Sequence, residues 1–219
     1  MDSISFVKEL AEANEALLGR LEPEGTLSAG APGPLTITGM LRIALKNELE
    51  ATELAALWMP STPELDVKLA LARQVGDEAK HYRLIESRLG ELGDDLEDFS
   101  PLEGGYGPLF KRLAEFQDTV ERVAAGQFTR EAIAVVKNRQ FIAFCKAQGD
   151  EETARLYEET IQPDEEHHHK LGWRILERYA TTSEAQSRAR RASEETLRLA
   201  DELQSLALEK KGVHHAPGC

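Results

Sequence analysis

The sequence predicts an all-α protein built around a four-helix bundle with one long crossover. Ala, Leu, Glu, Arg and Lys dominate the chain, and no alternating β-branched segment indicates a strand. A long connection over about 92–127 separates two helical hairpins with short turns, so we expect the second hairpin to pack against the first. The four helices of these hairpins are predicted over 36–59, 64–91, 128–148 and 150–180.

Further helices are predicted outside the bundle. The first covers 3–21 and is followed by a Gly/Pro-rich linker at 22–34, after which Thr36 or Thr38 could cap the first bundle helix. A helix over 109–125 lies within the crossover, and a charged helix over 183–211 precedes a loose tail. The predicted division is an N-terminal helix and linker, the bundle, and a C-terminal charged helix with its tail: 1–34, 35–181 and 182–219.

Charge and composition narrow the class of protein. The formal net charge of −13 argues against nucleic acid or an anionic membrane surface as the main partner. No run of eighteen apolar residues indicates a membrane span, and the N-terminus lacks the basic start and apolar middle of a signal peptide. Two cysteines, Cys145 and Cys219, do not form a disulfide framework, so we expect a cytoplasmic protein.

The second bundle helix carries a Glu-x-x-His motif, Glu78 and His81. Residues three apart lie on one helix face, and this face also carries an apolar stripe that includes Leu71 and Ile85. A carboxylate and an imidazole that point into a core are costly unless something binds them. On its own, one such motif is weak evidence for a metal site, because acids and histidines also occur together by chance on surface helices.

The fourth bundle helix repeats the motif in "DEEHHH", where two registers fit: Glu165 with His168, and Glu166 with His169. Tyr157, Ile161, Gly172 and Ile175 share a face with the first pair, whereas the second pair lies on a more polar face. We therefore expect Glu165 and His168 to point inward, with His167 and His169 outside or at the edge.

The other two bundle helices each offer one carboxylate, Glu48 and Glu131, on a largely apolar face. Glu48 and Glu78 are 30 residues apart, and Glu131 and Glu165 are 34 apart. The predicted turns fall near both midpoints, so the four motifs can meet in one layer of the bundle. Glu50 or Glu53 could replace Glu48 if the helix is rotated, and Glu121 is a less suitable alternative to Glu131.

Four carboxylates and two imidazoles can hold two divalent cations. The charges of two such ions balance four carboxylates that could not otherwise all stay ionised in a core. Oxygen and nitrogen donors favour two iron ions, with manganese or a mixed Mn/Fe pair as alternatives. Asp77 and Asp164, each directly before a motif glutamate, are candidates to orient the ligands from outside, with Asn138 and Tyr82 as further candidates.

These residues resemble the ferritin-like di-metal carboxylate superfamily. "ELEA" at 48–51 followed by "DEAKHYRLIESRL" at 77–89 is similar to the first hairpin of bacterioferritins and rubrerythrins, and "DEEHH" at 164–168 to their fourth-helix motif. The resemblance covers about 36–180 and implies a ferritin-like bundle with extra N- and C-terminal helices. The chain departs from that pattern at Pro163, which should kink or widen the helix just before the ligands.

The resemblance implies a non-haem diiron oxidoreductase that uses dioxygen and a small substrate, with Glu48, Glu78, His81, Glu131, Glu165 and His168 as metal ligands. The alternatives are a ferroxidase or iron-storage protein and a non-enzymatic helical interaction protein. We expect no nucleic-acid or membrane partner, and a homodimer as the candidate assembly. Trp58 and Trp173 are interpreted as packing residues, and His214 and His215 as part of a disordered tail.

Overall fold

The computed structural model describes residues 1–21 and 35–211, and within these ranges the chain is helical with no strand. The all-α prediction is confirmed. The elements are α1 (Ser3–Leu21), α2 (Ile37–Trp58), α3 (Leu65–Glu91), α4 (Pro108–Ala114), α5 (Thr119–Val123), η1 (Ala124–Arg130), α6 (Glu131–Ala147), α7 (Glu151–Leu156), η2 (Tyr157–Ile161), α8 (Gln162–Tyr179) and α9 (Ser183–Lys211).

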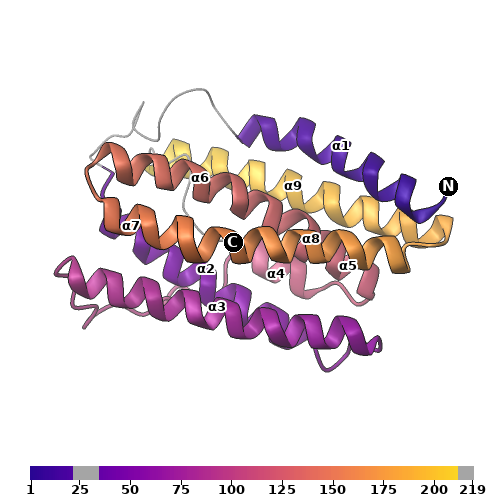
Figure 1. Ribbon diagram of the computed structural model, residues 1–219, viewed down its shortest axis with the longest axis horizontal. Helices are drawn as coiled ribbons and strands as arrows, with labels where there is room; N and C mark the ends of the chain where they lie inside the picture. The colour runs from indigo at the N-terminus through magenta and orange to yellow at the C-terminus, as the bar shows by residue number, and fades with distance from the viewer. Residues whose placement is uncertain (22–34, 212–219) are drawn as a thin grey trace.

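The helices lie roughly along one direction (Figure 1). In this view α3 runs along the bottom, α7 and α8 cross the middle, and α1 and α9 lie along the top. α2 packs along α3, α8 contacts both α3 and α6, and α1 and α9 contact each other and cover the side of α8 and η1. The long crossover between the hairpins contains the two short helices α4 and α5.

Polar caps and a glycine set the hairpin geometry. Thr36 caps α2 by accepting a hydrogen bond from Gly39 N, as one of the two predicted caps. In the second hairpin, Gly149 adopts a φ of +80° after α6, a conformation that glycine adopts without strain. Asp150 then caps α7 by accepting from Thr153 N, so the chain reverses within a few residues.

Two π-helical segments precede the helical turns that carry the predicted ligands of the third and fourth bundle helices. In η2, Gln162 N donates to Tyr157 O, five residues back, directly before Pro163. This wide turn is the local widening that Pro163 predicted, since proline cannot donate within the helix. A second wide turn, η1, was not predicted, and it ends where Glu131 N donates to Gly126 O.

Two glycines allow neighbouring helices to pack closely against η1. A Cβ on Gly172 of α8 would lie 2.6 Å from Phe128 N and 2.7 Å from Gln127 C, both backbone atoms of η1. A Cβ on Gly126 would lie 2.8 Å from the ring of Trp58. The wide turn therefore packs directly against α8 and α2, and neither glycine can carry a side chain without a shift of the backbone or of a buried ring.

The terminal helices contribute to the main hydrophobic core. Phe6, Val7 and Leu10 of α1 and Ala189 and Ala192 of α9 are buried. They belong to one cluster that also includes residues of α2, α3, η1 and α8. The predicted domain boundaries stay a prediction, but α1 and α9 are packing partners of the central helices rather than loose additions.

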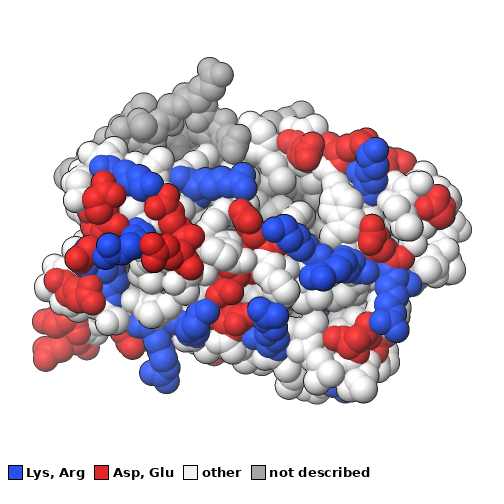
Figure 2. Space-filling view, viewed as in Figure 1, with Lys and Arg blue, Asp and Glu red and all other residues white. Residues whose placement is uncertain are grey.

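The surface shown in Figure 2 carries Lys and Arg side chains intermixed with Asp and Glu side chains. Among the described residues, no helix is long and apolar enough to cross a bilayer. The predicted linker at 22–34 and the tail at 212–219, with His214, His215 and Cys219, lie outside the described residues.

We expect Gly172→Ala to lower the free energy of unfolding by about 1–3 kcal/mol, because the new methyl group meets the backbone of η1. Urea denaturation measures the change. Gly76→Ala is the matched control: Gly76 lies in the middle of α3 with nothing within 4 Å of its Cβ position, so this change should raise stability by about 0.5–1 kcal/mol. Equal effects of the two substitutions would contradict the close approach.

Candidate metal centre

Six predicted side chains meet in one layer of the core. Glu48 comes from α2, Glu78 and His81 from α3, Glu131 from the start of α6, and Glu165 and His168 from α8. Each is at most 1% exposed. Within the described residues they form two groups of four, and in each group the potential ligand atoms lie within 4.8 Å of one another.

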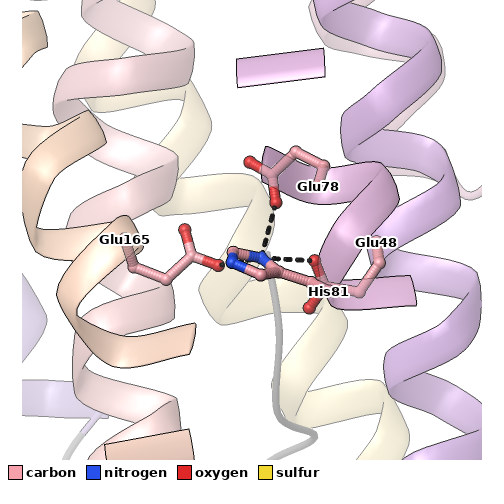
Figure 3. Close-up of side chains that lie close together, drawn as sticks. All are labelled: Glu48, Glu78, His81 and Glu165. Atoms are coloured by element: carbon pink, nitrogen blue, oxygen red, sulfur yellow. Dashed lines mark hydrogen bonds and ion pairs between the residues drawn. The ribbon is translucent and has the colours of Figure 1, made fainter. Parts of the chain in front are cut away.

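The first group consists of Glu48, Glu78, His81 and Glu165, whose side chains converge from three helices (Figure 3). His81 Nδ1 lies 3.2 Å from Glu78 Oε2, 3.4 Å from Glu48 Oε2 and 3.7 Å from Glu165 Oε1. One ring nitrogen therefore faces three carboxylates.

The second group consists of Glu78, Glu131, Glu165 and His168. His168 Nδ1 lies 3.4 Å from Glu78 Oε1 and 3.7 Å from Glu165 Oε2. Glu78 and Glu165 belong to both groups and turn one oxygen toward each histidine. These two carboxylates are therefore placed to bridge two neighbouring sites.

Two aspartates orient the histidines from the outside, and they do so crosswise. His81 of α3 has Nε2 at 3.1 Å from Asp164 Oδ2 of α8, and His168 of α8 has Nε2 at 3.1 Å from Asp77 Oδ2 of α3. A carboxylate that accepts from Nε2–H leaves Nδ1 directed at the glutamates. The structure thus places Asp77 and Asp164 where the sequence predicts them.

A buried glutamine was missed by the sequence analysis. Gln74 Nε2 donates to Glu131 Oε1 at 2.7 Å and to Glu78 Oε1 at 3.1 Å, while its own Oε1 accepts from Gln127 Nε2 at 2.7 Å. Gln74 lies one helical turn before Glu78 on the same face of α3, and this spacing is the signal that could have identified it. Lys80, which donates to Asp164 Oδ2 at 2.6 Å, was also missed.

The alternative ligands lie elsewhere. Glu50 accepts from Gly107 N, Glu53 accepts from the Tyr106 hydroxyl, and Glu121 lies in α5, before the wide turn. In the other register of α8, Glu166 pairs with Arg139, and His169 Nδ1 lies 2.7 Å from Phe128 O. Neither of the two four-residue groups includes any of these five side chains. Asn138 is buried in α6, and Tyr82 is half-buried in α3.

Without bound cations, protons retained by the buried groups balance the negative charge of the carboxylates. Burial opposes the charged form of His81, but hydrogen bonds with Glu48 and Glu78 raise its pKa to about 12. Burial raises the pKa of Glu48 to about 7, and burial together with the charge of Glu165 raises the pKa of Glu131 well above its usual value. Burial alone would raise the pKa of Glu78. Hydrogen bonds from His168 and His81 outweigh this effect, so the pKa of Glu78 lies well below its usual value.

The donor set fits divalent cations. Both carboxylate oxygens of Glu48 are buried and neither makes a well-aligned hydrogen bond among the described residues, although Oε2 lies 3.4 Å from His81 Nδ1. Buried oxygens of this kind are costly unless a cation or a proton binds them. Four carboxylates match the charge of two divalent ions, and mixed oxygen and nitrogen donors suit first-row transition metals.

The fold and the site together define an all-α protein with a buried carboxylate–histidine cluster. No family model matches the chain, and no curated protein matches it. Among solved structures, it is similar to a TenA homologue from Pyrococcus furiosus, with a TM-score of 0.61 and 18% identity over 88% of this chain and 94% of that chain. At this identity the likeness concerns the fold.

This likeness corrects the family and the function that were expected. The resemblance to the ferritin-like di-metal carboxylate superfamily was wrong, because the fold over 88% of the chain is similar to that of a TenA homologue. The physical reason is the shared core: α1 and α9 help bury the central helices, which a self-contained ferritin-like bundle does not require. The expected diiron oxidoreductase and its alternatives, the iron-storage protein and the non-enzymatic helical interaction protein, are overturned by the same finding.

We expect the chelator-treated protein to lose stability as the pH rises from about 6 to 9, by about 1 kcal/mol per pH unit. The folded-state pKa of His81 is about 12, against an ordinary value of 6.5, so the stability it contributes is complete below pH 6.5 and is lost toward pH 12. The raised pKa of Glu48, about 7, acts in the same direction between pH 4.5 and 7.

Urea denaturation in the presence of EDTA across this pH range measures the slope. His81→Gln removes one of the protonated groups and should give a smaller slope than the parent chain. A stability that stays constant or rises with pH would show that the folded state does not retain these protons.

Proposed function

We propose that the chain is a metalloprotein whose core layer binds two divalent first-row transition-metal ions. Glu48, His81, Glu78 and Glu165 would hold one ion, and Glu131, His168 and the same Glu78 and Glu165 would hold the other. The single observation that carries the proposal is the pair of four-residue groups that share two carboxylates. Iron and manganese are the ions that this donor set favours.

A purely structural role of the cluster is less favourable on energetic grounds. Removing four carboxylates and two imidazoles from water costs several kcal/mol per charged group, which hydrophobic side chains of similar size would avoid. The layer instead contains further polar side chains, since Asp77 and Asp164 orient the two histidines and Gln74 donates a hydrogen bond to Glu131. This arrangement is expected of a site that binds ions and must present ligand atoms in fixed directions.

The protein's own residues supply orientation and exclusion of water. The aspartates keep Nδ1 of each histidine aimed at the shared carboxylates, and Gln74 keeps Glu78 and Glu131 close together. The buried aromatic side chains Tyr157 and Phe141 pack in the core cluster beside the layer. Bound divalent ions would supply Lewis acidity toward an oxygen atom of a bound molecule.

We expect elemental analysis of purified protein to find about two transition-metal ions per chain. Glu78→Ala or Glu165→Ala should reduce the content to near zero, because each carboxylate belongs to both groups. Glu48→Ala or Glu131→Ala should remove about one ion, because each belongs to one group.

The matched controls are Glu166→Ala and His169→Ala, which change the neighbouring register of α8 and should retain about two ions. Circular dichroism confirms that each variant stays helical. Full metal content in both Glu78→Ala and Glu165→Ala would refute the proposed site. Loss of metal in Glu166→Ala and His169→Ala alone would instead assign the ligands of α8 to Glu166 and His169.

A further inference from the structure

A second candidate site lies on the other side of α6 and α8. A cavity of about 490 Å³ is bounded by α1, η1, α6 and α8. Ala132, Glu166 and His169 line it, and each directly follows one of the proposed metal ligands in the chain. Because these side chains point away from the metal layer, the cavity is separate from that layer, and it falls within the size range of small-molecule sites.

One wall of the cavity is aromatic. The rings of Phe128 and His169 have centroids 5.4 Å apart, and those of Phe128 and Trp173 are 5.9 Å apart. Leu18 of α1 and Val136 of α6 add aliphatic surface. A wall of this kind favours a flat ring that can stack on its side chains.

His169 provides one directed polar group in this wall. Its Nδ1 lies 2.7 Å from the carbonyl oxygen of Phe128, which can only accept, so Nδ1 carries the proton. In the neutral imidazole Nε2 is then an acceptor, and no described residue donates to it. A ligand with one N–H or O–H group can satisfy it.

The cations that the structure describes at the rim are paired. Arg139 and Lys170 line the cavity and are exposed, but both lie near Glu166, at 3.3 Å and 3.6 Å. The buried Asn14 is also engaged, because it donates to Thr129 Oγ1 and accepts from the Ser193 hydroxyl. The described cations at the rim are therefore engaged, and Glu15 adds a further carboxylate, so the cavity suits a neutral hydrogen-bond donor better than an anion.

We infer that this cavity binds a small neutral aromatic molecule that stacks against His169 and Trp173, whose rings pack on the fully buried Phe128, and donates one hydrogen bond to His169 Nε2. Two side chains that sequence reasoning left as an edge residue and a packing residue, His169 and Trp173, thereby form one site. The inference stands apart from the proposed metal centre, because no proposed ligand lines the cavity.

Indole and 1-methylindole are suitable probes, since they have the same ring and differ in the N–H donor. Isothermal titration calorimetry on the full chain should show saturable 1:1 binding of indole, about fivefold tighter than 1-methylindole, as expected for one hydrogen bond. His169→Phe should keep the ring and abolish that preference. His167→Phe, which changes a neighbouring histidine outside the cavity, should leave both affinities unchanged.

Ala132→Phe places a ring in the cavity and should weaken binding of both probes by at least tenfold. Leu18→Trp fills the same space from α1 and serves where the first variant does not fold. No saturable binding of indole, equal affinities for the two probes, or parent-like binding by a folded cavity-filling variant would overturn the inference.

Discussion

The rest of the structure depends on the burial of four carboxylates and two imidazoles in one layer of the core. Such a layer is stable only if protons or cations balance its charge and neighbouring groups hold each oxygen and nitrogen in place. The crosswise pairs of His81 with Asp164 and His168 with Asp77 tie α3 to α8, and Gln74 joins α3 to α6 through Glu131. The packing of the central helices is thus organised around polar contacts, with the apolar clusters above and below the layer.

The two π-helical turns have a clear place in this arrangement. Each ends just before a turn that carries ligands: η1 before Glu131, and η2 before Glu165 and His168. An additional residue in a helical turn changes the direction in which the following side chains point. The wide turns therefore help to aim the ligands of both α6 and α8 at the same layer, although α2 and α3 present theirs from regular helices.

Much of the site could be predicted because its signals are local or depend on simple geometry. Three-residue spacing places Glu78 with His81, and Glu165 with His168, and the distance of each motif from its turn brings the four helices together. Pro163 predicts the wide turn η2, because proline lacks the backbone N–H that a regular helix needs. The wide turn η1 has no such marker in its own segment, and Gly172, which packs against its backbone near Phe128, lies more than forty residues away in the chain. The overall fold could not be derived in this way, since the same spacing of carboxylates and histidines can occur on different helical folds and the roles of α1 and α9 emerge only from tertiary packing.

The complete burial of the six side chains also has a kinetic consequence. No member of the layer is more than 1% exposed, and the aspartates that flank it close the space between α3 and α8. If ions bind in this layer as proposed, they would reach or leave it only when these helices separate locally, so the rate of exchange would be governed by an opening motion of the protein rather than by the strength of the coordinating bonds. An ion incorporated while the chain folds would then be retained far longer than its equilibrium affinity suggests, and the metal carried by the protein would reflect the ions present during its synthesis.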